Sequence, residues 1–497
     1  MFRTSLGSLA QKARKLFEKS SFRKQQTSSQ IIASEQPHGA FRTIENIIPA
    51  NQQQKDAWVN SYLQERGFAP SNIAFDPEPW NSSPLSERIA SMQRALRQGE
   101  RNLILVYERA CGDSATFRYF GYNVAQHLNR SSTWNGIYLF VDELADAADI
   151  IASANAIALI RCRIRPELLT LAETAKQHMV PLAYIMDDNA LGASTAPHIV
   201  KLMANNPADS FEQDFWRGAT ARFHLASLLA DCFFAPVSYF AKILESQERK
   251  PAYVVHASLN DEQIAIAQAI SKSATPKTRK KHFDIGYFSG TSSHQDDFAL
   301  VHDALIEFLL ENNEARLVLG GQLTLSDELH SLMKQEKVVV LPRVDYVTLQ
   351  YLQAAVDVVL APLLEDEFTN CKSALKVFEA GVVGTPACAS PTVAYLEAVE
   401  TNVTGMICRN RSEWLAAFRT LYDNRDATNE MGNAARELAL SRYYGDAMRF
   451  EIENACEALA AAKLSPIPSE VLTALAGKSI EDWDNPFEAN PAFASES

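Results

Sequence analysis

The chain has 497 residues, of which 47% are hydrophobic and 22% are charged, and this balance is typical of a globular protein with packed cores. Its length exceeds what one ordinary core supports, so we expect two domains with additional segments. The net charge of −13 argues against binding to nucleic acid, which requires a basic face, although a nucleotide requires only a local positive pocket.

The seven cysteines are an odd number and show neither a C-x-x-C pair nor a metal-finger spacing. We therefore expect reduced, mostly buried thiols in a cytoplasmic protein. The sequence contains no uninterrupted run of about 18 apolar residues that would cross a bilayer, and its beginning lacks the apolar centre of a signal peptide.

Residues 1–24 carry seven Lys or Arg and one Glu, a local charge of +6 in an otherwise acidic chain. Their hydrophobic residues recur at helical spacing. A basic amphipathic helix of this kind suits the anionic inner face of a membrane, so we expect either peripheral attachment there or a solvated N-terminal helix. The Ser- and Gln-rich residues that follow indicate a linker, so residues 1–54 are expected to form a basic segment and linker.

Residues 55–270 are expected to form a first α/β domain, which begins with helical patterns at 57–66 and 86–98. Buried-strand patterns lie at 102–107, 136–141, 156–160, 181–186, 231–236 and 253–256, with helical patterns at 117–128, 166–178, 211–229 and 239–247 between them. This alternation predicts a parallel sheet with helices on both faces, as in a Rossmann-like domain.

Polar residues follow several of these strands. Asp113, in a Gly-containing loop after the first strand, and Arg118 are candidates for contact with a substrate at the edge of the sheet. Asp187 and Asp188 occupy the equivalent place after the fourth strand, where they would either serve such a site or only cap a turn. The alternating series Arg161-x-Arg163-x-Arg165 would face one side of an extended segment, toward an anion or toward solvent.

Residues 271–281 have the composition of an interdomain linker, and a second α/β domain is expected over residues 282–445. Its first strand runs into Ser289-Gly290-Thr291 and then a helix over residues 295–312. A small-residue loop before a helix start binds phosphate through backbone N–H groups, because glycine permits close approach. His294 is a candidate catalytic residue, or a cap at the helix start.

The most informative stretch is residues 360–395, in which a buried strand leads into a polar loop and a helix. Lys372 and Lys376 lie four residues apart, so they would share one helix face at a positive helix start, where a phosphate binds well. Glu379 follows one turn later, where its carboxylate would accept hydrogen bonds from ribose or sugar hydroxyls. Ligands in open α/β sheets bind at this kind of edge.

Three amphipathic helices are expected after residue 412, the last of them within residues 446–479. Residues 480–497 contain five acids and two Asn-Pro pairs, so we expect an acidic, disordered tail.

One block of the second domain resembles the donor-binding signature of GT-B glycosyltransferases of family 4 type, in the branch that builds O-antigens and related surface polysaccharides. The block includes Asn370, Lys372, Ser373, Lys376 and Glu379, followed by Gly384-Thr-Pro386, Ala389-Ser390 and Tyr395. The loops at 187–189 and 289–291 and the run Leu317-Val-Leu-Gly-Gly321 resemble the same family. The resemblance spans roughly residues 100–445.

The resemblance implies a GT-B fold, an α/β architecture of two Rossmann-like domains that face a central cleft, with C-terminal helices that cross back onto the first domain. It implies transfer of a hexose or related sugar from a nucleotide-diphosphate donor to a glycan or lipid-linked acceptor, with retention of the anomeric configuration and no metal or other cofactor. Lys372, Glu379 and His294 would be catalytic. The donor would contact Ser289, Gly290, Thr291, Asn370, Ser373 and Lys376, and the acceptor Asp113, Arg118, Asp187 and Asp188.

The chain departs from the family pattern at one position. Many relatives carry a Glu-x7-Glu pair, and the position eight residues before Glu379 is Cys371. Glu365, Asp366 and Glu367 lie just upstream, where one of them would have to supply the missing carboxylate. The alternatives are therefore a catalytically inactive sugar-binding or assembly protein, or another GT-B activity such as a sugar-nucleotide epimerase.

Overall fold

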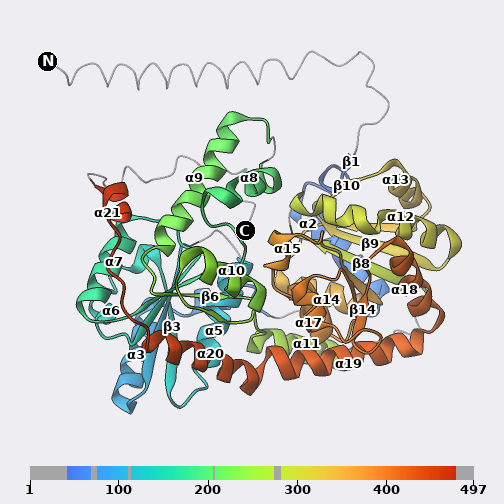
Figure 1. Cartoon of the computed structure of the whole chain (residues 1–497). Coiled ribbons are helices and arrows are strands. Elements are labelled where there is room, and N and C mark those ends of the chain that lie inside the picture. Colours follow the sequence, from blue (N-terminus) through green and yellow to red (C-terminus); the bar gives the residue numbers. More distant parts are fainter. Residues whose placement is uncertain are drawn as a thin grey trace. The chain divides into compact units, whose positions relative to one another are not determined.

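The computed structural model describes residues 42–68, 75–109, 114–204, 207–273, 281–290 and 292–476, beginning with β1 (Arg42–Thr43) (Figure 1). The chain divides into two compact units, Met1–Arg42 and Thr43–Ser497. The basic segment expected at residues 1–24 and the acidic tail expected from residue 480 lie outside the described residues.

The first domain contains a six-stranded parallel sheet of nearly continuous apolar strands. Its strands are β2 (Arg101–Tyr107), β3 (Trp134–Phe140), β4 (Ala156–Ile160), β5 (Leu182–Ile185), β6 (Cys232–Ala235) and β7 (Ala252–Val254). Their order in the sheet is β3-β2-β4-β5-β6-β7. The chain therefore changes direction across the sheet between β2 and β4, which is where α/β sheets bind ligands.

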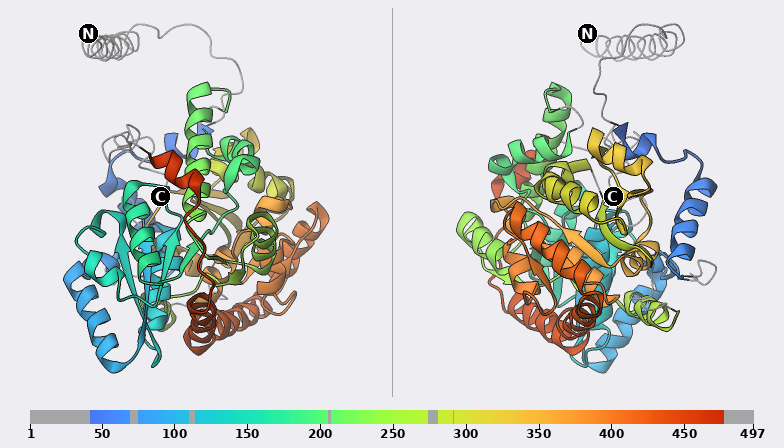
Figure 2. Two further views of the ribbon diagram at one scale, coloured as in Figure 1. Left: turned by 60° about the vertical axis from the view of Figure 1, so that its left-hand side comes forward. Right: turned by 90° about the vertical axis from the view of Figure 1, so that its right-hand side faces the viewer.

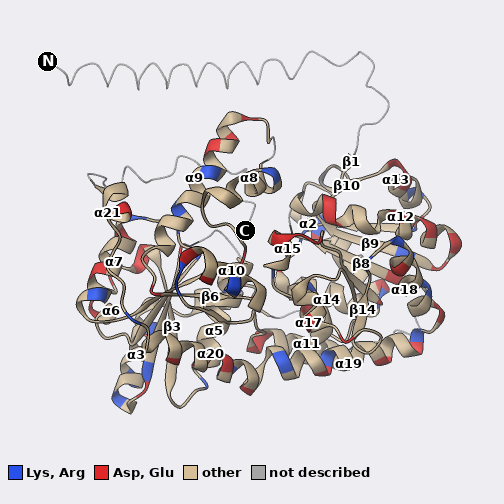
Figure 3. Cartoon of the chain, in the orientation of Figure 1, with Lys and Arg blue, Asp and Glu red and all other residues tan. Residues whose placement is uncertain are grey.

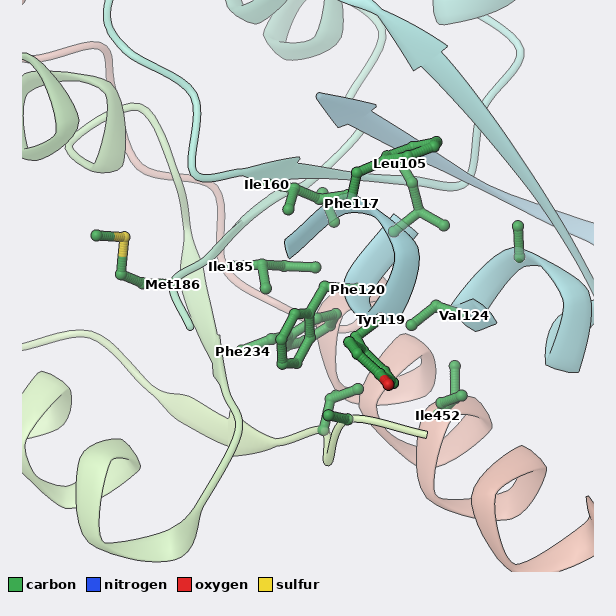
Figure 4. Packing of buried hydrophobic residues seen from close by; sticks show 14 of the residues in the cluster. Leu105, Phe117, Tyr119, Phe120, Val124, Ile160, Ile185, Met186, Phe234 and Ile452 are labelled. Carbon is green, nitrogen blue, oxygen red and sulfur yellow. The ribbon is translucent and has the colours of Figure 1, made fainter. Parts of the chain in front are cut away.

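Helices cover this sheet and connect its strands. They are α4 (Ala115–Phe117), a π-helical turn η4 (Arg118–Tyr122), α5 (Asn123–Leu128), α6 (Ala148–Ile151), α7 (Pro166–Gln177), α8 (Gly192–Met203), α9 (Ser210–Ser227), α10 (Ser238–Glu248) and α11 (Asp261–Ser273). α3 (Leu85–Gln98) packs against β3. Figure 4 shows Phe117, Tyr119 and Phe120 of the α4–η4 segment packed against β-strand residues such as Ile160 and Phe234.

The second domain repeats the plan with six further parallel strands. They are β8 (Phe283–Ser289), β9 (Ala315–Gly321), β11 (Val338–Leu341), β12 (Val358–Ala361), β13 (Ala387–Ala389) and β14 (Gly405–Ile407). The order β11-β9-β8-β12-β13-β14 is that of a dinucleotide-binding Rossmann sheet, and its direction changes between β8 and β12. β10 (Thr324–Leu325) lies outside this sheet.

The helices of the second domain are α12 (Gln295–Glu311), α13 (Asp327–Lys334), α14 (Tyr346–Ala355), α15 (Glu367–Asn370), α16 (Leu375–Val382), α17 (Val393–Ala398) and α18 (Arg411–Asp423). Gly321 ends β9 at φ +102°, and a Cβ there would lie 1.7 Å from the Ser289 carbonyl oxygen. Only glycine permits this close approach of the two strand ends. The predicted α/β fold class of GT-B type, with two Rossmann-like domains, is confirmed.

The C-terminal helices join the two domains, as the resemblance implies. α19 (Arg425–Tyr443) packs against α16, and α20 (Gly445–Ala460) packs against α5 of the first domain. Tyr443, at the end of α19, stacks on Phe378 with ring centroids 4.4 Å apart, and its carbonyl accepts a hydrogen bond from the Leu259 amide. α21 (Ser469–Leu475) follows and contacts α9.

The limits expected for the first domain need one correction. α2 (Gln52–Glu65) was assigned to the first domain, but it packs against α14 and β11 of the second. The reason is a buried ionic cluster just beyond its end, in which Arg66 binds Asp357 at 2.8 Å and Asp284 at 3.3 Å. Arg66 is only 2% exposed, so its charge requires these carboxylates, and they belong to the second sheet.

Candidate functional site

A cavity of about 380 Å³ lies where the carboxyl ends of the two sheets face one another. Its wall from the second domain comes from the loops after β8 and β12 and from the start of α16. Its wall from the first domain comes from α4, the loops after β4 and β5, and the helices α8 and α9. The positions at which both sheets change direction thus open into one site.

The second-domain wall carries the two expected cations. Lys372 and Lys376 both line the cavity, beside His294 at the start of α12. α16 begins at Leu375, and the short α15 ends at Asn370, so Lys372 lies between the two helices and Lys376 in the first turn of α16. Both lysines nevertheless lie within one turn of the start of α16, where the helix dipole adds positive potential.

Burial and neighbouring charges shift the pKa values of the side chains on the second-domain wall. Loss of solvent lowers the pKa of Lys376 to about 8, although Asp297 opposes the shift. The positive charge of Lys376, together with burial, lowers the pKa of His294 to about 4, so its imidazole is neutral at pH 7. His294 Nδ1 lies 2.7 Å from Asp297 Oδ2. Asp297 also accepts the Leu364 amide, and these hydrogen bonds outweigh its burial and hold its pKa below the usual range.

The ionised Asp297 fixes the tautomer of His294. Because a carboxylate only accepts hydrogen bonds, Nδ1 of the neutral ring carries the hydrogen and donates it to Asp297. Nε2 is then left as an acceptor. His294 can therefore accept a hydrogen bond from a sugar hydroxyl while the lysines neutralise a phosphate.

Acidic residues of the first domain face these cations. Asp188 Oδ1 lies 2.7 Å from Lys372 Nζ, and Asp187 lies 3.4 Å from Arg161 and accepts a hydrogen bond from Thr116. Burial disfavours the Asp188 carboxylate, but the charges of Lys372 and Arg161 outweigh it and hold the pKa of Asp188 below its usual range. Both aspartates line the cavity.

The alternating arginines do not share one side. Arg161 has a left-handed backbone conformation with φ 43°, which breaks the alternation expected of an extended segment. Its side chain lines the cavity, whereas Arg163 and Arg165 both bind Glu108, at 2.7 and 2.9 Å. Strained backbone of this kind clusters at functional sites.

The position of the missing family carboxylate is buried. Cys371 is 0% exposed, does not line the cavity, and its thiol hydrogen-bonds the Glu367 carbonyl. Burial raises the pKa of this thiol well above its usual value, so it stays protonated. Of the three upstream acids, Asp366 lines the cavity, and it also caps α15 through the Thr369 amide at 2.8 Å.

Glu379 lies one turn beyond Lys376 but outside the cavity lining. It accepts a hydrogen bond from the Tyr119 hydroxyl of the first domain. Burial and the negative charge of Glu379 raise the pKa of Tyr119 well above its ordinary value, so the hydroxyl remains a donor. Gln263 in turn donates to the Tyr119 oxygen at 3.1 Å.

The other predicted site residues are distributed as follows. Gly290 and Ser373 line the cavity, whereas Ser289 is buried at the end of β8. Asn370 does not line it and accepts the Val393 amide at 3.0 Å. Arg118 is also away from the cavity and lies over the Tyr346 ring at 4.2 Å. Thr291 and Asp113 lie outside the described residues.

The cavity lining includes Asp297, Tyr119 and Thr116, which the sequence did not single out as site residues. The i, i+3 spacing of His294 and Asp297 was the one available signal, since it is typical of a side-chain pair at a helix start. Tyr119 and Thr116 gave none, because their partners Glu379 and Asp187 are distant in sequence.

Among the described residues, no three His, Cys, Asp or Glu side chains come together in a group that would bind a metal ion. In the same residues, no helix has the length and apolar character needed to span a bilayer. Figure 3 shows acidic and basic residues interspersed over both domains.

Comparison with known proteins gives a match in the second domain. Residues 282–424 match the family model described as glycosyl transferases group 1. No curated protein matches the sequence.

Solved structures with a similar arrangement have low sequence identity. HepE of Anabaena in complex with UDP and glucose is 16% identical, with a TM-score of 0.47 over 73% of this chain and 100% of its own. A glycosyltransferase from Rickettsia africae is 11% identical, with a TM-score of 0.49 over 73% of this chain and 100% of its own. Sucrose-phosphate synthase of Thermosynechococcus elongatus is 12% identical, with a TM-score of 0.45 over the same shares.

The family match covers β8 to α18, and so it includes the loop after β8 and the start of α16 that carry His294, Lys372 and Lys376. Residues 282–424 are thus the part of this chain that is similar to group 1 glycosyl transferases.

Proposed function

We propose that the protein is a retaining, metal-independent glycosyltransferase that moves a hexose or related sugar from a nucleotide-diphosphate donor to a glycan or lipid-linked acceptor in surface polysaccharide synthesis. The observation that carries the proposal is the pair Lys372 and Lys376, which faces the cavity from the group 1 domain and opposes the aspartates 187 and 188. The second domain, residues 282–445, would bind the donor and the first domain the acceptor.

The charges of the cavity suit this reaction. As the glycosidic bond breaks, the diphosphate gains negative charge while the sugar becomes oxocarbenium-like. Lys372, Lys376 and the dipole at the start of α16 would stabilise the leaving diphosphate. His294, held neutral by Lys376 and oriented by Asp297, would accept from a sugar hydroxyl through Nε2.

Asp187 and Asp188 stand on the acceptor side, where their carboxyl oxygens would accept hydrogen bonds from acceptor hydroxyls. Ser289, Gly290, Thr291, Asn370 and Ser373 remain proposed donor contacts, the first three through the loop after β8. Asp113 and Arg118 remain proposed acceptor contacts.

A non-catalytic sugar-binding protein is the second candidate, because the position of the first family carboxylate holds the buried thiol of Cys371. A sugar-nucleotide epimerase would use the same donor cavity without an acceptor. Incubation with a panel of nucleotide sugars separates these three proteins. A transferase releases the nucleoside diphosphate and passes the sugar to an acceptor, an epimerase changes the sugar without net release, and a binder does neither.

The nucleotide is found first by thermal shift. A ligand present at about 100 times its Kd raises the free energy of unfolding by about 2.7 kcal/mol, which is readily measured. The panel is UDP, GDP, dTDP, ADP and CMP. Failure of all five to raise Tm would contradict the proposal of a nucleotide-diphosphate site.

The basic residues 1–24 are proposed to attach the protein to the anionic cytoplasmic face of a membrane, near a lipid-linked acceptor. Their support is the local charge of +6 and the helical spacing of their hydrophobic residues. Deleting them should release the protein from anionic vesicles while hydrolysis of a soluble donor continues. If the shortened protein binds the vesicles as well as the full-length protein does, residues 1–24 do not attach it to the membrane.

A further inference from the structure

One side of the cavity is apolar and is built by two helices of the first domain. On α9, Trp216, Ala219, Thr220 and Phe223 line the cavity at a spacing of three, four and seven residues from the first, which is one helix face. On α8, Ile199, Leu202 and Met203 line it at similar spacing. We call the six apolar residues among these, Ile199, Leu202, Met203, Trp216, Ala219 and Phe223, the α8–α9 wall.

The fold does not need this pair of helices to cover its sheet. α8 and α9 together join β5 to β6, whereas α7 alone joins β4 to β5 and α10 alone joins β6 to β7. α8 packs mainly on α9, and both project beyond the sheet in each view (Figure 2). Within α9, Ala226 and Ser227 at the C-terminal end are buried, while most of the first half is exposed or half-buried. Trp216 in that half and Phe223 in the second half pack against the core on one side, and both remain half-buried, so packing within the chain covers them only in part.

The proposed donor does not account for the part of the α8–α9 wall that faces the cavity. Lys372 and Lys376, which would bind the diphosphate, belong to the second domain, whereas the α8–α9 wall belongs to the first. A second ligand would cover the part of the wall that the protein leaves facing the cavity.

Two nitrogen atoms along the same wall have unmet hydrogen-bonding capacity. Trp216 Nε1 and His198 Nε2 are buried, and neither has a partner within the described part of the chain. Both residues line the cavity. A buried donor without a partner costs about 1–3 kcal/mol, so such a group in a native structure requires an explanation. An oxygen of a ligand that lies along the wall would provide the partner.

We propose that the acceptor is amphiphilic, and that its alkyl chain lies along the α8–α9 wall while oxygens near its head bind Trp216 Nε1 and His198 Nε2. Its hydroxyl-bearing head then lies toward Asp187 and Asp188, across from the donor. This inference rests on the proposed function, since it names the acceptor class for the same cavity.

The probe is a series of alkyl glucosides, from methyl to octyl, used below the concentration at which they form micelles. Each buried methylene should raise affinity about fourfold, the factor that corresponds to 0.8 kcal/mol. Binding to the full-length protein is measured by calorimetry, with the nucleotide identified in the thermal-shift panel present at saturation.

Two variants test whether the alkyl chain of the ligand binds at the α8–α9 wall. Trp216→Ala and Leu202→Asn should each flatten the dependence on chain length, so that octyl glucoside binds about tenfold or more weakly than to the wild type. Phe450→Ala is the matched control, because Phe450 is an apolar side chain of α20 that is 55% exposed and not part of the cavity. It should bind the whole series as the wild type does.

Three results would overturn the inference: affinity that does not rise with chain length, equal losses in Phe450→Ala and Trp216→Ala, or a loss of nucleotide affinity in Trp216→Ala, which would assign the nucleobase to the wall. Failure of the proposed function is separate, because it appears as a wild-type protein that binds no nucleotide of the panel. Alkyl glucosides can be titrated in that case too.

Discussion

Lys372 Nζ and Asp188 Oδ1, 184 residues apart in sequence, form an ion pair of 2.7 Å that joins the two domains across the cavity. The side chains are 24% and 26% exposed, so water screens the pair and its contribution to stability is modest. A diphosphate that binds Lys372 would have to compete with this carboxylate. The pair therefore couples the donor side of the cavity to the acceptor side.

Lys372→Ala should lower kcat by roughly 10²–10³, because it removes a preorganised charge that acts most strongly on the departing diphosphate. Binding of the bare nucleoside should hardly change, since a nucleoside lacks the phosphates. Steady-state kinetics and calorimetry measure both quantities. Lys334→Ala, an exposed lysine at the end of α13, is the control and should behave as the wild type. Turnover at the wild-type rate in Lys372→Ala would show that Lys372 does not stabilise the departing diphosphate.

Affinity for the nucleoside diphosphate should fall as the pH rises above about 8. Burial lowers the pKa of Lys376 to about 8, so the free protein loses this positive charge as the pH rises through that value. The phosphate, with a second pKa near 6, is already ionised there, so its charge does not change. If binding requires the charged form of Lys376, the affinity decreases by up to about tenfold per pH unit above pH 8.

The check is calorimetric titration between pH 7 and pH 10 with the wild type and with Lys376→Arg. The arginine keeps its charge throughout, so its affinity should vary little over this range. If the affinities of the two proteins change with pH in the same way, the charge of Lys376 does not contribute to binding of the phosphate.

Glu379→Gln should weaken binding of the nucleotide and the donor while the fold is retained. The amide keeps the size of the side chain but accepts hydrogen bonds from hydroxyls less strongly than a carboxylate does. Nucleotide affinity and Tm are measured together, with Tyr119→Phe as the matched variant, since it removes only the hydroxyl that donates to Glu379. If both Glu379→Gln and Tyr119→Phe lower Tm without changing the affinity for the nucleotide, Glu379 serves only to join the domains.

Turnover should survive excess EDTA. The lysines 372 and 376 supply positive charge where a metal ion would otherwise neutralise the diphosphate. Donor hydrolysis is compared before and after chelation. Complete loss of activity, restored by Mg²⁺ or Mn²⁺, would instead indicate ligands among Asp187, Asp188 and residues 365–367.

Arg66→Ala should lower the free energy of unfolding by about 3–5 kcal/mol, because it leaves the buried Asp357 carboxylate without its cation and leaves Asp284 with Arg316 alone. Arg66 also donates to the Ala355 and His282 carbonyls, at 2.7 and 3.0 Å, which would lose their partner. Chemical denaturation measures the change. Arg97→Ala, at the exposed end of α3, should stay within about 0.5 kcal/mol of the wild type. An equally small change in Arg66→Ala would show that α2 is held by packing alone.

Local sequence patterns determined most of the parallel framework. The strand at residues 156–160 was predicted residue for residue and the helix at residues 295–312 to within one residue, because continuous apolar runs and period-3.6 patterns are set by burial of near neighbours. The start of α7 at Pro166 was equally clear, since proline favours the first turn of a helix. The i, i+4 spacing of Lys372 and Lys376 was read from the same kind of local pattern, and both side chains line the cavity, while their role as a phosphate site stays a prediction.

Other elements carried no reliable local signal. α8 has Pro197 in its interior and Gly192 at its start, and both disfavour a helix, so it forms through its packing on α9. The π-helical turn at Arg118–Tyr122 likewise has no sequence period of its own.

Only the tertiary structure decided which residues meet. Lys372 with Asp188 and Glu379 with Tyr119 are pairs between domains, and the second pair is 260 residues apart. Periodicity reports which face of an element is buried, but it carries no information about which distant face will lie opposite. That choice depends on how the two sheets dock, and here the docking set the partners of Lys372 and Glu379.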